Sequence, residues 1–228
     1  MCENSVNFFE RKIVESADGS HTILLSDTNE TFHSQHGAVQ ESKHVFIKNG
    51  LNMCSKKIIH ILEIGFGTGL NAFLTFLEAL HNNLTIFYTA IEKYPISIQE
   101  AHQLNYPKFL NAKKEDFLEF HNNIWNTEYE IGKNFFLKKI NSDILNFSLE
   151  EEELFDLIYF DAFSPVNQSE LWAEEVFANI YLHTAKGGLL STYSSKGIVK
   201  QNLRNCGFIV KRLKGPPGKH HILNAHKI

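Results

Sequence analysis

The chain has 228 residues, of which 43% are hydrophobic and 12% aromatic, and its formal net charge is −4. This length suits one globular domain, or one domain with an extension, and no apolar run approaches the ~20 residues of a membrane span. The N-terminus lacks the basic and apolar regions of a signal peptide. Three widely spaced cysteines argue against a disulfide framework or a CxxC zinc site. We therefore expect a cytoplasmic protein without a membrane or metal partner.

The first 50 residues predict a small extension that packs on the main domain, residues 51–228. Residues 11–25 predict a β-hairpin with turn chemistry at its centre. A polar segment follows, and the spacing after it is helical. His33 and His36 have the spacing of metal ligands, but no carboxylate or cysteine nearby in the sequence completes a site. Polar contacts to a ligand or to the backbone are the favoured role for these two histidines.

The most informative stretch runs from Ile58 to Leu70 and predicts a buried strand followed by a glycine turn. An amphipathic helix is expected next, over 71–80, which completes the start of a nucleotide-binding βαβ unit. A dinucleotide fingerprint would need a glycine where Leu70 stands. Glu63, two residues before the first glycine, suits a ligand that carries an ammonium group. The pattern resembles motif I of class I S-adenosylmethionine methyltransferases; a NAD site or a turn without a ligand are the alternatives.

Three further strands, over 84–91, 135–140 and 154–160, are each followed by an acidic residue. Glu92 stands where a ribose would present its hydroxyls, and Asp143 where an adenine amino group needs an acceptor. Asp161 is expected beside the glycine turn, near a cofactor's reactive group. The alternative for Glu92 is capping a helix or lying on the surface, and the alternative for Asp161 is capping the next helix.

The region 102–134 predicts helices with an irregular connection. Its aromatic residues are suited to stacking on bases, but packing against the core is the favoured interpretation. Pro95 is expected to begin the helix before this region, and Glu150 to Glu153 are expected at a solvated helix end.

The last third predicts alternating helices and strands that carry a strong positive charge. Lys186-Gly-Gly is expected to stop the first helix. From Lys186 onward there are nine Lys and Arg residues and no Asp or Glu, a charge of +9 that leaves −13 for the remainder. This asymmetry favours a polyanion-binding face, or else a solvated surface with its charges spread around the fold. The predicted elements are helices over 170–182 and 195–205, strands over 189–193, 208–213 and 222–226, and a basic loop over 214–221.

Taken together, these motifs resemble the methyltransferase domain of the tRNA 5-methylaminomethyl-2-thiouridine biosynthesis enzymes. The resemblance covers nearly the whole chain and includes the histidine-containing N-terminal segment. It departs from the family at Ala162, where a glycine is usual, and in the Pro-Pro pair of the basic loop. The motifs that carry it are residues 63–71, 91–95, 161–165 with Trp172, 186–188, 192–195, 207–208 and 214–219.

The resemblance implies an α/β fold of the class I S-adenosylmethionine methyltransferase type, Rossmann-like, with about seven strands in a mixed sheet flanked by helices. A small N-terminal β-hairpin extension completes it. The implied reaction moves a methyl group from S-adenosyl-L-methionine to the 5-aminomethyl group of the wobble uridine in the anticodon region of tRNA. Since the chain stops after the last strand, we expect a stand-alone methyltransferase, with a separate enzyme supplying the aminomethyl-uridine.

The resemblance also implies roles for individual residues. Asp161 would be catalytic: it would orient the substrate amine and accept its proton. The expected cofactor-binding residues are Glu63, Gly65, Phe66, Gly67, Gly69, Asn71, Glu92, Lys93, Asp143 and Ile144. The expected substrate-binding residues are Phe163, Ser164, Pro165, Lys219 and His220.

Three other functions remain open at this point. The same cofactor could serve an N-methyltransferase for a small-molecule or protein amine. A non-catalytic module that binds RNA or a nucleoside is a second alternative, although a dead enzyme need not retain all four acids. Aminopropyl transfer shares the fold, but the basic loop over 214–221 suits a polyamine poorly.

Overall fold

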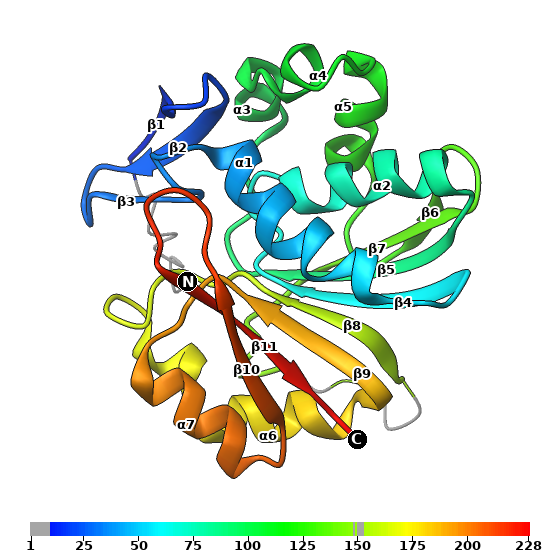
Figure 1. The fold of residues 1–228 in the computed structure, drawn as a ribbon. Helices are drawn as coiled ribbons and strands as arrows, with labels where there is room; N and C mark the ends of the chain where they lie inside the picture. The colour runs from blue at the N-terminus through cyan, green and yellow to red at the C-terminus, as the bar shows by residue number, and fades with distance from the viewer. Residues whose placement is uncertain (1–9, 148, 150–152) are drawn as a thin grey trace, which may run out of the picture.

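The computed structural model describes residues 10–147, 149 and 153–228, and it is built on a mixed eight-stranded sheet with the order β10-β11-β9-β8-β4-β5-β7-β6 (Figure 1). The sheet has one strand more than the roughly seven expected. The four central pairings are parallel, whereas β6, β10 and β11 pair antiparallel. The strands are β4 (Ile58–Ile64), β5 (Thr85–Glu92), β6 (Glu128–Glu130), β7 (Phe135–Asn141), β8 (Phe155–Phe160), β9 (Thr184–Thr192), β10 (Ile209–Lys214) and β11 (His221–His226).

The strand order reverses at β4, because the next strand along the chain, β5, lies on one side of it and β8 lies on the other. The carboxyl ends of these parallel strands open at the same edge of the sheet, where α/β proteins bind their ligands. All six residues of β8 are buried, as expected for a strand covered on both faces. This arrangement sets the position of the site described below.

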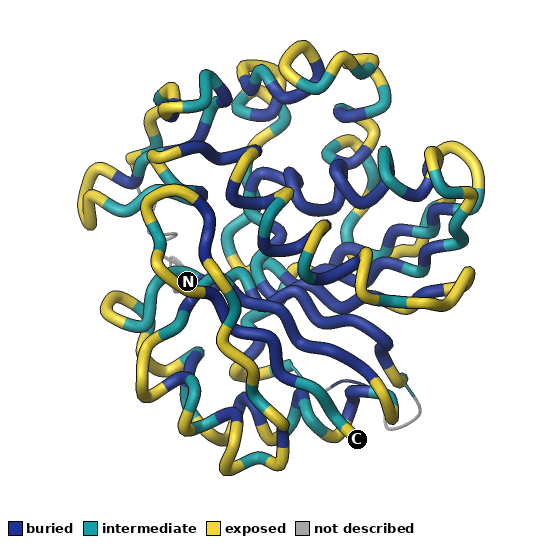
Figure 2. The backbone as a smooth tube through the Cα atoms, viewed as in Figure 1, coloured by how far each residue is buried: buried dark blue, intermediate teal, exposed yellow. Residues whose placement is uncertain are grey.

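Helices cover both faces of the sheet (Figures 1 and 2). One face carries α1, α2 and α3 to α5, and the other carries α6 and α7. Two buried clusters correspond to these two layers. The helices are α1 (Ala38–Ser42), the π-helical η1 (Lys43–Lys48), the 3₁₀ turn η2 (Leu51–Met53), α2 (Leu70–Asn82), α3 (Ile98–Gln103), α4 (Tyr106–Phe109), α5 (Lys114–Asn122), the 3₁₀ turn η3 (Ser169–Trp172), α6 (Glu174–Leu182) and α7 (Gly197–Asn205).

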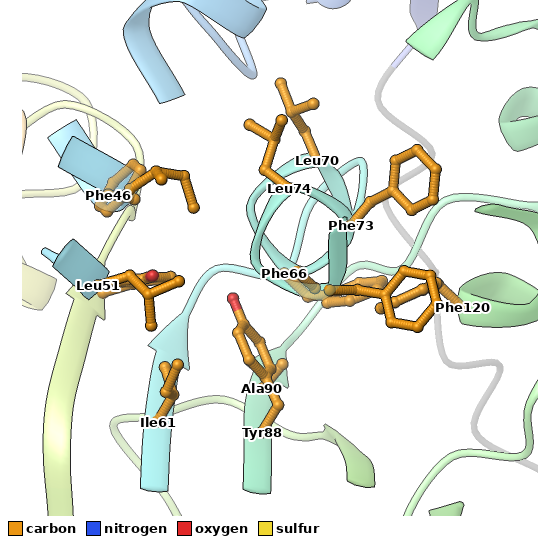
Figure 3. Packing of buried hydrophobic residues seen from close by; sticks show 14 of the residues in the cluster. Phe46, Leu51, Ile61, Phe66, Leu70, Phe73, Leu74, Tyr88, Ala90 and Phe120 are labelled. Carbon is orange, nitrogen blue, oxygen red and sulfur yellow. The ribbon is translucent and has the colours of Figure 1, made fainter. Parts of the chain in front are cut away.

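Helix α2 is the centre of the larger cluster (Figure 3). Its side chains Phe73 and Phe76 pack edge-on against Phe120 of α5, and Phe46 of η1 lies on the other side of the helix. Tyr106, Phe117 and Phe120 are fully buried. The prediction that aromatic residues of the 102–134 region pack against the core is therefore confirmed for these three side chains.

The N-terminal extension forms a separate three-stranded sheet of β1 (Arg11–Glu15), β2 (His21–Leu25) and β3 (Glu30–Thr31). The hairpin of β1 and β2 is confirmed, and β3 was not predicted. Long-range bonds tie the segment after this sheet to β9 and β11: the Ser191 hydroxyl donates to the Val45 carbonyl at 2.9 Å, and the Asn224 amide donates to the Asn49 carbonyl at 2.7 Å. The boundary at residue 50 stays a prediction.

Three local predictions were wrong. Pro95 does not begin a helix: α3 starts at Ile98 because Ser97 and Glu100 form a capping box there. Lys186-Gly-Gly does not stop a helix but lies inside β9, where Gly187 has a φ of +80°. The helix expected over 170–182 is divided into η3 and α6.

Two further predictions concern residues that lie largely outside the described ranges. The expected helix end at Glu150 to Glu153 is described only at its last residue, and most of the N-terminal stretch that was read for a signal peptide lies before residue 10. Across residues 10–228, apart from 148 and 150–152, none of the helices combines the length and the apolarity needed to cross a bilayer.

Candidate active site

A cavity lies where β4, β5, β7 and β8 end, and each strand delivers its next residues to the wall. The cavity encloses about 800 Å³ between protein atoms, including the part open to solvent. Eight of the predicted site residues line it: Gly65, Gly67, Glu92, Lys93, Asp143, Ile144, Asp161 and Phe163.

The glycine turn after β4 brings its backbone close to the loop that follows β8, the neighbouring strand in the sheet. Gly65 has a φ of +90°, and a Cβ built there would stand 2.7 Å from the carbonyl oxygen of Asp161. A side chain at this position would therefore be strained by the backbone and would collide with the loop that carries Asp161. The turn ends at Gly69, whose left-handed backbone starts α2.

Glu92, the last residue of β5, is held by two backbone N–H groups. The Gly67 amide donates to Oε2 at 2.9 Å, and the Tyr94 amide donates to Oε1 at 2.8 Å. An ionised carboxylate has about four lone-pair sites, so both oxygens retain capacity to accept hydroxyl groups of a ligand in the cavity. The carboxylate is thus fixed before any ligand arrives.

Asp143 follows β7 and forms an ion pair with Lys93, with 2.8 Å between Oδ2 and Nζ. Partial burial works to raise the pKa of Asp143, but hydrogen bonds from Lys93 and from the Leu145 amide outweigh it and lower the pKa. Ile144, which is buried, adds an apolar surface next to this carboxylate. The wall here combines one charged acceptor with aliphatic side chains.

Asp161 follows β8 and is the most perturbed carboxyl of the cavity wall. Burial raises its pKa to about 7, although the Asn71 amide donates to Oδ2 at 2.7 Å and acts in the opposite direction. His33 Nδ1 lies 3.9 Å from Oδ2. Because burial lowers the pKa of His33 to about 3, this contact joins a neutral imidazole to a carboxyl and is not a salt bridge near neutral pH.

The structure places four predicted cofactor residues behind the cavity wall instead of in it: Glu63, Phe66, Gly69 and Asn71. Asn71 Nδ2 donates to Glu63 Oε1 at 2.9 Å as well as to Asp161. Glu63 is fully buried, and burial raises its pKa well above the ordinary value. Its other oxygen, Oε2, has no hydrogen bond of good geometry among the described residues, although the Tyr88 hydroxyl is close enough to act on the carboxyl.

On the substrate side, the predicted residues divide into two groups. Phe163 lines the cavity, and the Trp172 indole fixes it by donating to its carbonyl at 2.8 Å. Ser164 and Pro165 are half-buried outside the cavity lining. Lys219 is paired with Glu41 and lies 4.2 Å from the centre of the Tyr193 ring, whereas His220 is exposed.

Two cavity residues from the N-terminal extension, Phe32 and His33, were not predicted as part of this site. The sequence singles out His33 only as one of two histidines in a polar segment. Phe32 packs edge-on against Phe163, with 5.2 Å between the ring centres. Nothing in the local sequence shows that this segment reaches the end of β8. The other unpredicted lining residues are Ile64, Ile91, Tyr94, Ser142, Leu145, Ala162, Gln168, Glu170 and Leu171.

Comparison with known proteins gives a consistent family. Residues 104–228 match a family model described as S-adenosyl-L-methionine-dependent methyltransferase. The tRNA 5-methylaminomethyl-2-thiouridine biosynthesis bifunctional protein MnmC of Campylobacter fetus is 34% identical over 81% of this chain, and its Leptospira interrogans counterpart is 28% identical over 89%. The chain spans 31% and 33% of those two proteins, about a third of their length.

Solved structures agree. The crystal structure of MNMC2 from Aquifex aeolicus matches 96% of this chain and 71% of its own, with a TM-score of 0.76 and 27% identity. Spermidine synthase from Thermotoga maritima matches 95% of this chain and 68% of its own with a TM-score of 0.56, and at 14% identity it shows the shared fold alone.

Proposed function

Because the chain belongs to the S-adenosyl-L-methionine-dependent methyltransferase family, we propose that it methylates the 5-aminomethyl group of the wobble uridine in tRNA. The product would be the 5-methylaminomethyl form of the nucleoside. The observation that carries the proposal is Asp161: a buried carboxyl at the end of β8, in the wall of the cofactor cavity, with a pKa raised to about 7. The relatives named for 5-methylaminomethyl-2-thiouridine biosynthesis support the choice of substrate.

The residues of the cavity fit the cofactor, S-adenosyl-L-methionine. Glu92 would accept hydrogen bonds from the ribose hydroxyls, and Asp143 with Ile144 would hold the adenine. Gly65 and Gly67 let the turn pass close to Asp161 and Phe32, since a Cβ would stand 2.7 Å from the Asp161 carbonyl oxygen and 3.0 Å from the Phe32 ring. The cofactor supplies an electrophilic methyl group, and the electron pair of the breaking bond stays on its sulfur as the amine lone pair forms the new bond.

Asp161 would prepare the amine for this step. A primary amine is mostly protonated near neutral pH and has no lone pair to offer until it loses a proton. A carboxylate with a pKa of about 7 is matched to that task, because general bases are most effective near the operating pH. Most of the rate gain would come from holding the amine in line with the methyl group.

The basic segment from Lys186 to the end of the chain would contact tRNA phosphates. Most of its charged side chains are exposed, among them Lys211, Arg212 and Lys214. Phosphate contacts release counterions, so binding would weaken steeply with added salt. The substrate would come from a separate enzyme that produces the aminomethyl group on the uridine. We expect the methyl transfer to take place in the cytoplasm.

The test is transfer of labelled methyl from S-adenosyl-L-methionine to tRNA that does or does not carry aminomethyl-uridine, followed by nucleoside analysis. Label in 5-methylaminomethyl-uridine, and only with the aminomethylated tRNA, would support the proposal. Cofactor binding without label on either tRNA would contradict it and would direct attention to a small-molecule or protein amine.

A further inference from the structure

The geometry points to His33 as a second acceptor for the substrate amine, paired with Asp161, so that a primary amine is held by two hydrogen bonds and methylation stops after one methyl group. This inference rests on the proposed function and deepens it, because it assigns a contact in the reaction to a residue of the N-terminal extension. His33 is then a catalytic residue in the sense that it touches the reacting amine.

The two side chains form a matched pair in the cavity wall. Both line it, their side chains are only 6% and 9% exposed, and His33 Nδ1 lies 3.9 Å from Asp161 Oδ2. That separation is too long for a hydrogen bond between them. It does suit a third atom: a nitrogen about 2.9 Å from each acceptor fits in front of the pair.

The surroundings of His33 fix its ring. Nε2 lies 2.7 Å from Thr68 Oγ1, which also accepts from the Tyr106 hydroxyl at 3.3 Å. The His33 backbone amide donates to Thr22 Oγ1 at 2.9 Å. The proposal requires that Nε2 carries the ring proton and donates it to Thr68, which leaves the Nδ1 lone pair facing the cavity. Among the described residues, no acceptor lies within bonding distance of Nδ1 to favour a proton there.

The charge state agrees with an acceptor role. Burial first, and then the positive charge of Lys219, lower the pKa of His33 to about 3. The ring is therefore neutral across the physiological range and can accept through Nδ1. Lys219 belongs to the basic loop and forms an ion pair with Glu41.

The number of N–H groups on the substrate then decides the product. The ammonium form of the substrate has three N–H groups, and one of these protons passes to Asp161. The neutral amine keeps two N–H donors and one lone pair: one donor bonds the Asp161 oxygen that does not carry the proton, the other bonds His33, and the lone pair remains for the methyl group. After one transfer, the secondary amine has a single N–H and leaves one buried acceptor unpaired. Because leaving a buried acceptor unpaired costs free energy, the second methylation should be about tenfold slower than the first.

The experiment compares single-turnover methylation of tRNA carrying aminomethyl-uridine with tRNA carrying methylaminomethyl-uridine. The unaltered protein should methylate the first at least about tenfold faster. His33→Ala should lose about tenfold on the first and little on the second, so that the ratio approaches one. His33→Asn should keep the ratio, because its side-chain oxygen is an acceptor attached at the same carbon as Nδ1. His81→Ala, in an exposed residue of α2, is the control.

The outcomes separate this inference from the proposed function. No methylation of aminomethylated tRNA by the unaltered protein would overturn the proposed function and the role of His33 with it. Methylation with an unchanged ratio in His33→Ala, or with equal losses in His33→Ala and His33→Asn, would overturn only the role of His33. If His33→Ala shows no cooperative melting transition, the test rests on the unaltered protein alone. Equal rates for the aminomethylated and the methylaminomethylated tRNA would then exclude the two-acceptor arrangement.

Discussion

Asn71 joins two buried carboxyl groups through one amide nitrogen: its Nδ2 lies 2.9 Å from Glu63 Oε1 and 2.7 Å from Asp161 Oδ2. Glu63 belongs to β4, Asp161 follows β8, and Asn71 lies in the first turn of α2. The amide thus connects the glycine turn to the proposed catalytic carboxyl. It also favours the charged form of both acids, against the effect of their burial.

Asn71→Ala should therefore shift the pH dependence of methyl transfer to higher pH, because the pKa of Asp161 would rise above about 7. The unfolding free energy at pH 8 should fall by about 1–3 kcal/mol, since two buried acceptors lose their donor. Asn82→Ala is the matched control: Asn82 also donates to a glutamate of α2, Glu78, but is only half-buried. Equal effects of the two substitutions on the pH profile would contradict the assigned role of the bridge.

Asp161→Asn should slow methyl transfer by about 10²- to 10⁴-fold, the range of a general base. Cofactor binding, followed by calorimetric titration, should persist. Near-normal turnover in this variant would show that Asp161 is not the proton acceptor.

The same substitution should stabilise the fold at high pH. The pKa of Asp161 rises from 3.8 to about 7 on burial, so its ionisation lowers the stability of the folded protein progressively as pH increases from about 4 to 7. The maximum loss is about 4 kcal/mol, reached above pH 7. Urea unfolding at pH 4 and pH 8 should show that Asp161→Asn gains stability relative to the unaltered protein only at the higher pH.

Glu92→Gln should weaken the binding of S-adenosyl-L-methionine by about 10- to 100-fold, because charge-assisted hydrogen bonds to the ribose lose about 1.5–3 kcal/mol. The amide group would also leave either the Gly67 or the Tyr94 backbone N–H without its acceptor. Glu115→Gln, at an exposed position of α5, should leave the dissociation constant unchanged. A dissociation constant for Glu92→Gln equal to that control would remove Glu92 from the cofactor site.

A pair of glycine substitutions separates backbone strain from close contact. Gly65 and Gly187 both have a positive φ, +90° and +80°, but a Cβ at Gly187 would meet nothing within 4 Å, whereas at Gly65 it would stand 2.7 Å from the Asp161 carbonyl. Gly187→Ala should cost about 1–3 kcal/mol from strain. Gly65→Ala should cost more and should also abolish cofactor binding; similar losses for the two in thermal melting and titration would count against the close approach.

Arg212→Ala and Lys214→Ala should each reduce the slope of log binding constant against log salt by about 1, if each side chain contacts one phosphate. Both residues are exposed near the end of β10, which leads into the basic loop. Lys114→Ala, at an exposed position of α5, is the control. Unchanged slopes in filter binding of tRNA would place the contact surface elsewhere.

The acids at the strand ends were predictable because the topology of a parallel sheet brings those ends together. Glu92, Asp143 and Asp161 each follow a recognisable buried strand, and all three line the same cavity. The contribution of His33 depends on how the extension lies on the domain, and local sequence does not encode that. The bond from Asn71 to Asp161 joins residues 90 positions apart in the sequence, so local sequence could not reveal it either.

Other differences have local causes that were visible only in three dimensions. The Lys186-Gly-Gly sequence has the composition of a turn, yet it stays within β9, where the Gly187 amide donates to the Lys227 carbonyl at 2.8 Å and the Lys227 amide donates to the Gly188 carbonyl at 3.0 Å. The capping box at Ser97 moved the start of α3 beyond Pro95. In both cases hydrogen bonds to other residues outweighed the local preference, that of glycine for a turn and that of proline for the start of a helix.

The bonds from Ser191 and Asn224 to the Val45 and Asn49 carbonyls join parts of the chain that are synthesised at different times. The segment 38–53 emerges from the ribosome early, but its partners on β9 and β11 emerge more than 140 residues later. Contacts between such distant residues form slowly, because a long loop must close before they gain anything. The Val45 and Asn49 carbonyls therefore lack these partners until nearly the whole chain has been made, and the segment 38–53 cannot be fixed to β9 and β11 before then.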